Sequence, residues 1–497
     1  MLLLGAFVHG LATFAVRWRT GRIDAYAFSS LDCGEYYNIA RNLLGHAAFS
    51  SAEAPPFVPD TWRTPGYPLF LAASVFVVGS SPAALVVVQQ VLSALGVVLL
   101  FQIVRRHMND RRAAMVAVLF LIEPYGLYYS FWLLSTTWFT TLLLITWCSY
   151  ERAIGNRRWT WFAATGLLSG LLVLTWPGAV LIPVAVLIGL FLSIPARSTN
   201  VQTSKRPNVQ KRKRRNDHGG VIWSFGLLDF WTFQGEGRGE DRIVCARRLP
   251  AIAAFLTCCA IVIAFWMVRN LYVSGHAALS HQSGIVLAYF KATEVELWRQ
   301  GRANDRYIET SLNPESEHLP HAVWDEIDEK LGMQMDGREQ GEIAELRWPN
   351  LAQGNKTPTD SFEISRALTS IAWEYFERSP WATVICCVVR IGDNLVFPLG
   401  LAIERPAGVD VNRLRSAALG AAYTLLAVFA IVGIIRARRR WRIIYLPVGC
   451  MVALALTTTP QIDPRFRVPM IPLLLFVALL PGTRTVDKGY SSRGSSS

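Results

Sequence analysis

The sequence predicts an all-α integral membrane protein, and three observations support this fold class. Of its 497 residues, 52% are hydrophobic and only 17% are charged, whereas soluble proteins carry about 25% charged residues. The apolar residues gather in blocks of roughly 17–25, the length that crosses the hydrocarbon core of a bilayer. Because lipid offers no partners to backbone N–H and C=O groups, each block is expected to form a helix.

About ten blocks are predicted to be transmembrane helices. They cover residues 1–17, 83–104, 112–130, 132–150, 159–175, 177–195, 250–268, 413–435, 442–459 and 466–481. The apolar stretch 66–79 is shorter and follows Pro65, so we predict a membrane-dipping or surface helix there. The stretch 381–400 carries Arg390 and Asp393, which favours an amphipathic helix at the membrane interface over a crossing.

The charges predict how these helices are oriented. The formal net charge is +13, and Lys and Arg are concentrated in the cytoplasmic loops of membrane proteins. If the ten helices cross and the two other stretches do not, four basic groups fall on one side, at 105–112, 152–158, 205–215 and 436–440. We therefore predict a multi-pass protein of the plasma (inner) membrane with both termini in the cytoplasm. This bias accounts for the basic balance, so nucleic acid is not expected as a partner.

The same topology divides the chain into regions. The N-terminal helices fill 1–195 and enclose a first extracytoplasmic loop, 18–82. A second such region, 269–412, follows the helix 250–268 and contains an acidic, mostly helical part with 18 acidic and 10 basic residues between Lys291 and Pro380. The remaining regions are a basic cytoplasmic insertion predicted to be disordered, C-terminal transmembrane helices and a cytoplasmic tail, at 196–249, 413–481 and 482–497.

The first extracytoplasmic loop holds the main candidates for chemistry. Asp32 fits the N-cap of a helix that has Glu35 in its first turn. One face of this helix is apolar and is expected to lie on the membrane, which would hold both carboxylates near the lipid headgroups; it consists of Tyr36, Ile39, Ala40, Leu43 and Leu44. Asp32 is then either a cap alone or a functional carboxylate.

Several arginines lie where the positive-inside bias does not favour them. Arg465 and Arg467 lie between the last two predicted spans, and Arg269 lies at the extracytoplasmic end of the span 250–268. A lipid phosphate is the obvious anionic partner for these side chains. Arg63, in the first loop, can hold a phosphate through paired hydrogen bonds, or it can extend to the interface as a snorkelling side chain.

Glu123 lies near the extracytoplasmic end of a predicted span, directly before Pro124. An intramembrane carboxylate is costly and is therefore a functional candidate, although a proline-terminated helix end also suits an interfacial glutamate. The eight cysteines form no CxxC pair and show no metal-ligand spacing. Neither a metal site nor a disulfide framework is predicted.

Five short passages carry a family likeness when they are read in order. They are Asp32–Leu44 (Asp-x-x-x-Tyr-x-x-x-Ala-x-x-Leu), Arg63–Leu71 (Arg-Thr-Pro-Gly-Tyr-Pro-Leu-Phe-Leu), Trp266–Gly275, Trp373–Pro380 and Pro464–Leu474. Together they resemble the GT-C membrane glycosyltransferases, specifically the family 39 group related to dolichyl-phosphate-mannose protein mannosyltransferases and lipid A aminoarabinose transferases. The resemblance extends over nearly the whole chain apart from 196–249.

The resemblance implies a GT-C-type bundle whose extracytoplasmic loops form the active site. Asp32 would act as general base on an acceptor hydroxyl, with Glu35 as a second catalytic carboxylate and Tyr36 as a further candidate. The acceptor would attack the anomeric carbon with inversion, and a polyprenyl phosphate would leave. Positive charge is needed where the phosphate gains charge, and the candidates for it are Arg63, Arg269, Arg465 and Arg467.

The implied partners are a polyprenyl-phosphate-linked sugar donor, a protein, lipid or glycan acceptor, and membrane lipids. No cofactor is implied. Lipid-monophosphate donors in this family do not generally demand a metal, which leaves a divalent ion open.

Four positions depart from the family pattern. Thr136 stands where a Leu-Leu-Ser-Glu motif often has Glu, and Trp176 stands where the usual motif is Thr-Arg-Pro. Phe265 replaces a proline and Phe466 replaces a tyrosine. Glu123 is a candidate replacement for the lost glutamate. These changes leave the donor sugar open, and two other functions stay compatible with the sequence: a non-enzymatic carrier or flippase for lipid-linked sugars, and an envelope assembly partner.

Overall fold

The computed structural model describes residues 1–156, 158–193, 248–301, 320–334, 358–396, 411–438, 441–460 and 464–481. Within these ranges the chain is helical and has no strand. Nearly all of the predicted insertion 196–249, the tail 482–497 and parts of the acidic loop region lie outside the described residues.

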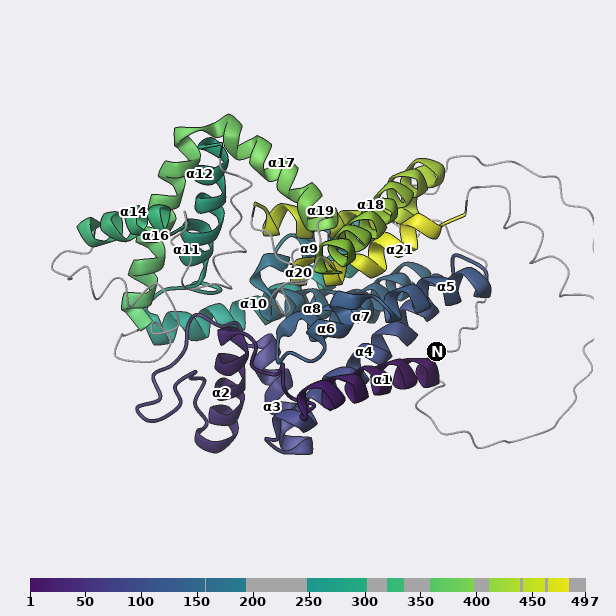
Figure 1. The fold of residues 1–497 in the computed structure, drawn as a ribbon, viewed down its shortest axis with the longest axis horizontal. Coiled ribbons are helices and arrows are strands. Elements are labelled where there is room, and N and C mark those ends of the chain that lie inside the picture. The colour runs from purple at the N-terminus through teal and green to yellow at the C-terminus, as the bar shows by residue number, and fades with distance from the viewer. Residues whose placement is uncertain are drawn as a thin grey trace, which may run out of the picture.

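The helices follow one another from α1 to α21 (Figure 1). The first half of the chain forms α1 (Leu2–Thr20), α2 (Leu31–His46), α3 (Gly66–Val78), α4 (Pro82–Val104), α5 (Asp110–Leu121), α6 (Pro124–Tyr129), α7 (Ser135–Asn156), α8 (Trp159–Thr175) and α9 (Ile182–Ser193). The second half forms α10 (Arg248–Ser274), α11 (Ser283–Ile285), the π-helix η3 (Val286–Ala292), α12 (Thr293–Arg299), α14 (Pro320–Gln334), α16 (Pro358–Arg378), α17 (Pro380–Val396), α18 (Val411–Ala437), α19 (Trp441–Thr458), α20 (Pro464–Arg467) and α21 (Ile471–Leu479).

The chain is a multi-pass membrane protein. Among the described residues, α4, α10, α18 and α19 are long and apolar enough to cross a membrane by length and composition. Shorter apolar helices include α3, α8 and α17. The predicted membrane class is therefore confirmed, whereas the count of about ten crossings stays a prediction.

Two predicted spans are interrupted in the structure. The stretch 112–130 divides into α5 and α6, because Pro124 cannot continue a helix and restricts the residue before it. Glu123 is the N-cap of α6, where its carboxylate accepts hydrogen bonds from the backbone N–H groups of Tyr125 and Gly126. The stretch 177–195 begins with the 3₁₀ turn Pro177–Ala179 before α9.

Helices α8 and α10 pack closely because α8 presents glycines to its neighbour. A Cβ atom at Gly166 would collide with the backbone carbonyl of Phe255, and one at Gly170 would lie 3.0 Å from the carbonyl oxygen of Cys259. The two glycines are four residues apart, a spacing that lets membrane helices approach each other along one face.

A separate group of helices stands at one end of the bundle. Figure 1 shows α2, α11, α12, α14 and α16 gathered there, away from the N-terminus. We call residues 21–65 together with α11 to α16 the cap region. It has its own hydrophobic core, which Trp62 joins from the first loop; the other members include Tyr289, Trp324, Ile327, Ile364, Leu368 and Ile371. Trp62 therefore joins the first loop to the second loop region, whereas Cys33 and Ala40 of α2 belong to the core of the bundle.

Helix α2 corrects two predictions. Its N-cap residue is Ser30, so Asp32 lies in the first turn and the prediction of Asp32 as the cap was wrong. The apolar face is also covered by protein: Ile39 and Ala40 are fully buried, and Tyr36 packs edge-on against Tyr67 of α3. The face predicted to lie on the membrane is therefore largely an internal packing surface.

Helix α17 has the amphipathic pattern predicted for 381–400, of which 397–400 lie outside the described residues. Trp381, Val384 and Val388 are exposed along one face. On the other face Arg390 is buried and pairs with Glu294 of α12 at 2.8 Å. The polar side of α17 therefore faces the cap region, and its place at a membrane interface stays a prediction.

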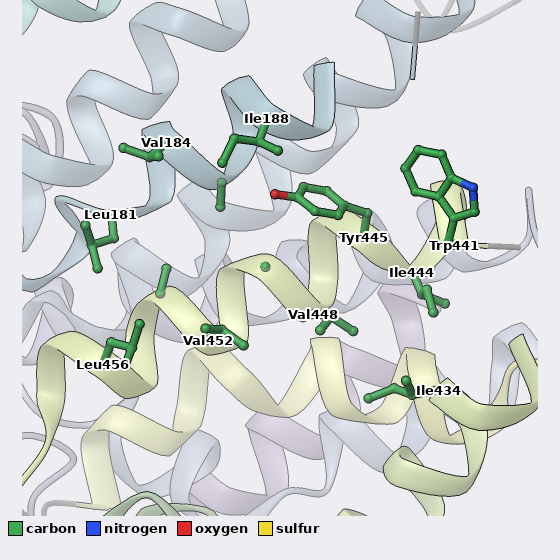
Figure 2. A pocket seen from close by; sticks show the side chains of 13 residues that line it. Leu181, Val184, Ile188, Ile434, Trp441, Ile444, Tyr445, Val448, Val452 and Leu456 are labelled. Carbon is green, nitrogen blue, oxygen red and sulfur yellow. The ribbon is translucent and has the colours of Figure 1, made fainter. Parts of the chain in front are cut away.

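An apolar groove of about 530 Å³ runs between α9 and α19. Figure 2 shows side chains of both helices, with Ile434 of α18, around it. Its lining is almost wholly hydrophobic and extends along α19 from Trp441 to Leu456.

The packing of α8 on α10 gives a stability prediction. Gly166→Leu is expected to cost about 1–3 kcal/mol, because the new side chain must displace the backbone of α10. The apparent melting temperature of the detergent-solubilised protein measures this loss. Gly10→Leu is the control, since a Cβ atom there meets nothing within 4 Å. Equal melting temperatures for the two variants would contradict the packing described here.

Candidate active site

Two carboxylates and two arginines from three distant segments meet where the cap region joins the bundle. One η nitrogen of Arg63 donates to Asp32 at 2.5 Å, and one of Arg465, from α20, donates to the other carboxylate oxygen at 3.1 Å. The ε nitrogen of Arg63 donates to Glu35 at 2.5 Å. Both oxygens of Asp32 are thus held by arginines, one of which lies 433 residues away in the sequence.

Arg63 is fixed by its own loop. The carboxylate of Asp60 accepts the backbone N–H groups of Trp62 and Arg63, each at 2.8 Å. Trp62 is buried in the core of the cap region. On the other side, a Cβ atom at Gly66 would lie 2.7 Å from the Cα of Thr175, so the start of α3, three residues after Arg63, rests directly on the end of α8. The guanidinium of Arg63 is therefore positioned before any ligand binds.

Further contacts surround the Arg63 side chain. The amide oxygen of Gln282 accepts a hydrogen bond at 3.3 Å, and the ring of Tyr36 lies 5.1 Å from the guanidinium carbon. Tyr36, predicted as a site candidate, thus packs against the cluster. The α2 carboxylates, the loop arginine and the residues before α11 form one connected network.

Burial and nearby charges shift the pKa values of the two carboxylates in opposite directions. Burial favours the neutral form of Asp32, but the positive charges of Arg63 and Arg465 and their hydrogen bonds outweigh it and lower the pKa to about 2. Burial raises the pKa of Glu35 to about 7; the charge of Arg63 opposes this rise, and the charges of Asp32 and Asp60 reinforce it. At neutral pH Asp32 is therefore ionised, whereas the pKa of Glu35 lies well above its ordinary value.

The cluster is open on one side. The side chains of Arg465 and Asp32 are 30% and 20% exposed, whereas those of Arg63 and Glu35 are 8% and 11% exposed. An anion that approaches from outside therefore meets Arg465 and Asp32 first, with Arg63 behind them.

The other two candidate arginines lie elsewhere. The ε nitrogen of Arg467 donates to the backbone carbonyl of Asn394 at 2.7 Å, and its guanidinium lies 4.4 Å from the centre of the Tyr423 ring. Arg269 donates to the backbone carbonyl of Asp60 at 2.6 Å and lies over the ring of Trp266. Arg269 therefore supports the loop that carries Arg63, and Arg467 joins α17, α18 and α20.

Glu123 also belongs to the Arg467 environment. Its carboxylate caps α6 and accepts a hydrogen bond from the Tyr423 hydroxyl of α18. The structure thus places Glu123 in a helix-linking role beside Arg467, apart from the cluster around Asp32. It gives no support to Glu123 as the replacement for the family glutamate.

Sequence reasoning missed Asp60 and Gln282. Asp60 lies three residues before Arg63, a spacing at which an aspartate can accept backbone N–H groups of a turn. This spacing in the sequence could therefore have identified Asp60 as a residue that fixes the turn before Arg63. No sequence pattern identifies Gln282, because its contact with Arg63 depends on the fold of the cap region. Among the described residues, no group of three or more His, Cys, Asp or Glu could hold a metal ion.

Comparison with known proteins bears on this geometry. The family model of dolichyl-phosphate-mannose-protein mannosyltransferases matches residues 62–206, a segment that begins beside Arg63 and runs through α9. The chain resembles a GT-C glycosyltransferase of this family. The match confirms the predicted resemblance to this family, and of the five passages Arg63–Leu71 lies within the matched segment. None of the curated protein sequences matches the chain.

Several solved structures align with 96% of the chain at 14% identity, among them an oligosaccharyltransferase and ArnT. The oligosaccharyltransferase of Archaeoglobus fulgidus, tethered to an acceptor peptide, has a TM-score of 0.42, with 48% of that chain covered. ArnT from Cupriavidus metallidurans, bound to undecaprenyl phosphate, has a TM-score of 0.36, with 77% covered. The chain therefore spans about half the length of the oligosaccharyltransferase.

The raised pKa of Glu35 gives a pH prediction. The carboxyl has an ordinary pKa of 4.5 and a folded-state pKa of about 7, so the native state binds its proton more tightly than the unfolded chain does. This stabilisation is complete below pH 4.5 and is lost as the pH rises towards 7. The melting temperature of the wild type should fall across this window, and Glu35→Gln should flatten the fall.

The control is Glu329→Gln, at an exposed position on α14. Its melting curve should follow that of the wild type at every pH. Identical slopes for Glu35→Gln and the wild type would contradict the described environment of Glu35.

Proposed function

We propose that this protein is a glycosyltransferase that moves a sugar from a polyprenyl-phosphate donor to an acceptor hydroxyl. The observation that carries the proposal is the Asp32 carboxylate with each oxygen held by a different arginine. A carboxylate can take the proton of the acceptor, and two adjacent guanidinium groups can stabilise a departing phosphate. The family matched over 62–206 is named for dolichyl-phosphate mannose and protein, which supports this donor class.

In the proposed reaction, the acceptor oxygen attacks the anomeric carbon from the face opposite the phosphate. The new bond joins that oxygen to the anomeric carbon, and the bond from the anomeric carbon to the phosphate oxygen breaks. The bonding electrons leave with the polyprenyl phosphate, and the acceptor proton passes to Asp32. Attack opposite the leaving group inverts the configuration. Glu35 keeps Arg63 oriented throughout.

Donor binding would also change the strength of the base. With both arginines in place the pKa of Asp32 is about 2, so the resting carboxylate is a weak base. A phosphate competes for the same guanidinium groups through paired hydrogen bonds. When the phosphate accepts hydrogen bonds from Arg63 and Arg465, Asp32 is released from at least one of them. Its pKa then rises, and the carboxylate can accept a proton.

The groove between α9 and α19 suits the polyprenyl chain of the donor. Its hydrophobic lining and an isoprenoid chain would bury apolar surface against each other. The groove ends at Leu456, next to Thr457, whose backbone carbonyl accepts a hydrogen bond from Lys291 of η3 at 2.7 Å. The end of the groove therefore lies next to a residue that contacts η3 of the cap region, on the side where the charged headgroup would lie.

The predicted topology puts this reaction on the extracytoplasmic face of the plasma (inner) membrane, with both termini in the cytoplasm. The acceptor would be a hydroxyl of a protein, a lipid or a glycan. The reaction as proposed uses no cofactor, because Arg63 and Arg465 supply the positive charge at the leaving group.

Replacement of the proposed base tests this function. Asp32→Asn keeps the side-chain shape but cannot accept the proton, so transfer should fall by about 10²–10⁴-fold. The assay measures transfer of radiolabelled sugar from a panel of polyprenyl-phosphate sugars to membrane and envelope extract. Asp24→Asn, in the same loop and paired with the exposed Arg22, should transfer normally. Wild-type transfer by a folded Asp32→Asn protein would refute the assignment.

A further inference from the structure

Two departures from the family motifs meet in space beside the Asp32 cluster. Trp176, at the position of the usual arginine, lies at the C-terminal end of α8 with its ring stacked on Phe466 of α20. The ring centres are 5.2 Å apart and the planes are 16° from parallel. Phe466 stands at the position of the usual tyrosine. The positive charge of the usual arginine and the hydroxyl of the usual tyrosine are thus both absent here, and two stacked aromatic rings take their places.

This pair adjoins the cluster on both sides. Phe466 follows Arg465, whose guanidinium carbon lies 5.3 Å from the centre of the Phe466 ring while its nitrogen contacts Asp32. Trp176 follows Thr175, which touches Gly66 at the start of α3, directly after the loop that carries Arg63. Each ring is therefore one residue away from a segment that builds the cluster.

The indole is held firmly but is not fully covered. Phe139 of α7 packs edge-on against it with ring centres 5.1 Å apart, and Phe466 covers part of one face. Phe466 is 7% exposed, whereas Trp176 is only partly buried. The exposed part of the indole leaves ring surface that a ligand can contact.

We propose that Trp176, backed by Phe466, is the platform for the donor sugar and selects a neutral sugar that presents a face of C–H bonds. This inference rests on the proposed function. A sugar joined to a phosphate held by Arg465 would lie near this pair, because the Arg465 guanidinium is 5.3 Å from the Phe466 ring and Phe466 stacks on Trp176. Aromatic faces attract apolar C–H surface through dispersion and burial. An arginine in place of Trp176 would instead favour an anionic or hydroxyl-rich contact.

Binding measurements with and without the sugar test the platform. The purified full-length protein in lipid nanodiscs is titrated with dolichyl phosphate, dolichyl-phosphate mannose and dolichyl-phosphate glucose. The readout is the ratio of the Kd for dolichyl phosphate to the Kd for the better-bound sugar form. Trp176→Leu should lower this ratio by about tenfold, and Trp176→Phe should stay within about threefold of the wild type.

Phe139→Leu is the control for packing, because it loosens the same indole from the side without removing its face. This variant should melt earlier and keep the wild-type ratio. An unchanged ratio in Trp176→Leu would overturn the platform, and so would an equal loss of ratio in Phe139→Leu.

The same titration separates this inference from the proposed function. A wild-type protein that binds dolichyl phosphate but neither sugar form more tightly would overturn the platform and leave the phosphate site standing. A wild-type protein that binds none of the three lipids would overturn the donor class itself, and the platform with it.

Discussion

The pairing of Asp32 with Arg63 and Arg465 is the interaction on which the rest of the site depends. It joins α2 and the first loop to α20, near the other end of the chain. Buried charges are tolerated only when they are paired and hydrogen-bonded. The segments around the cluster must therefore hold their positions closely, and the contacts of Asp60, Trp62 and Gly66 do this for the Arg63 loop.

The same constraint explains why the charged groups of the protein form separate sets. Arg467 and Glu123 belong to an environment shared with Tyr423, Tyr125 and Asn394, which ties α6, α17, α18 and α20 together. Arg269 stabilises the loop that carries Arg63 by donating a hydrogen bond to the backbone carbonyl of Asp60. Only Arg465 and Arg63, of the four candidate arginines, contact Asp32 in the described part of the chain, so they are the pair that a phosphate would displace.

Much of the fold could be predicted because run length and charge are local signals. The helices α4, α10, α18 and α19 follow from apolar blocks, and the break at Pro124 has a cause in the sequence, although we predicted one span there. The site was harder to predict from the sequence. Asp32, Glu35 and Arg63 stand out in the first loop. The contact of Asp32 with Arg465, however, joins residues that are 433 positions apart in the sequence. Ser30 as the true cap and the stacking of Trp176 on Phe466 depend on one-residue differences and tertiary contacts that no local pattern encodes.

The central claim is that a lipid phosphate replaces Asp32 as the partner of the two arginines. An electron cryomicroscopy structure of the protein in nanodiscs with dolichyl phosphate tests it most directly. The account predicts the phosphate between Arg63 and Arg465, with Asp32 released from at least one of them. A phosphate bound elsewhere, with both contacts of Asp32 intact, would contradict it.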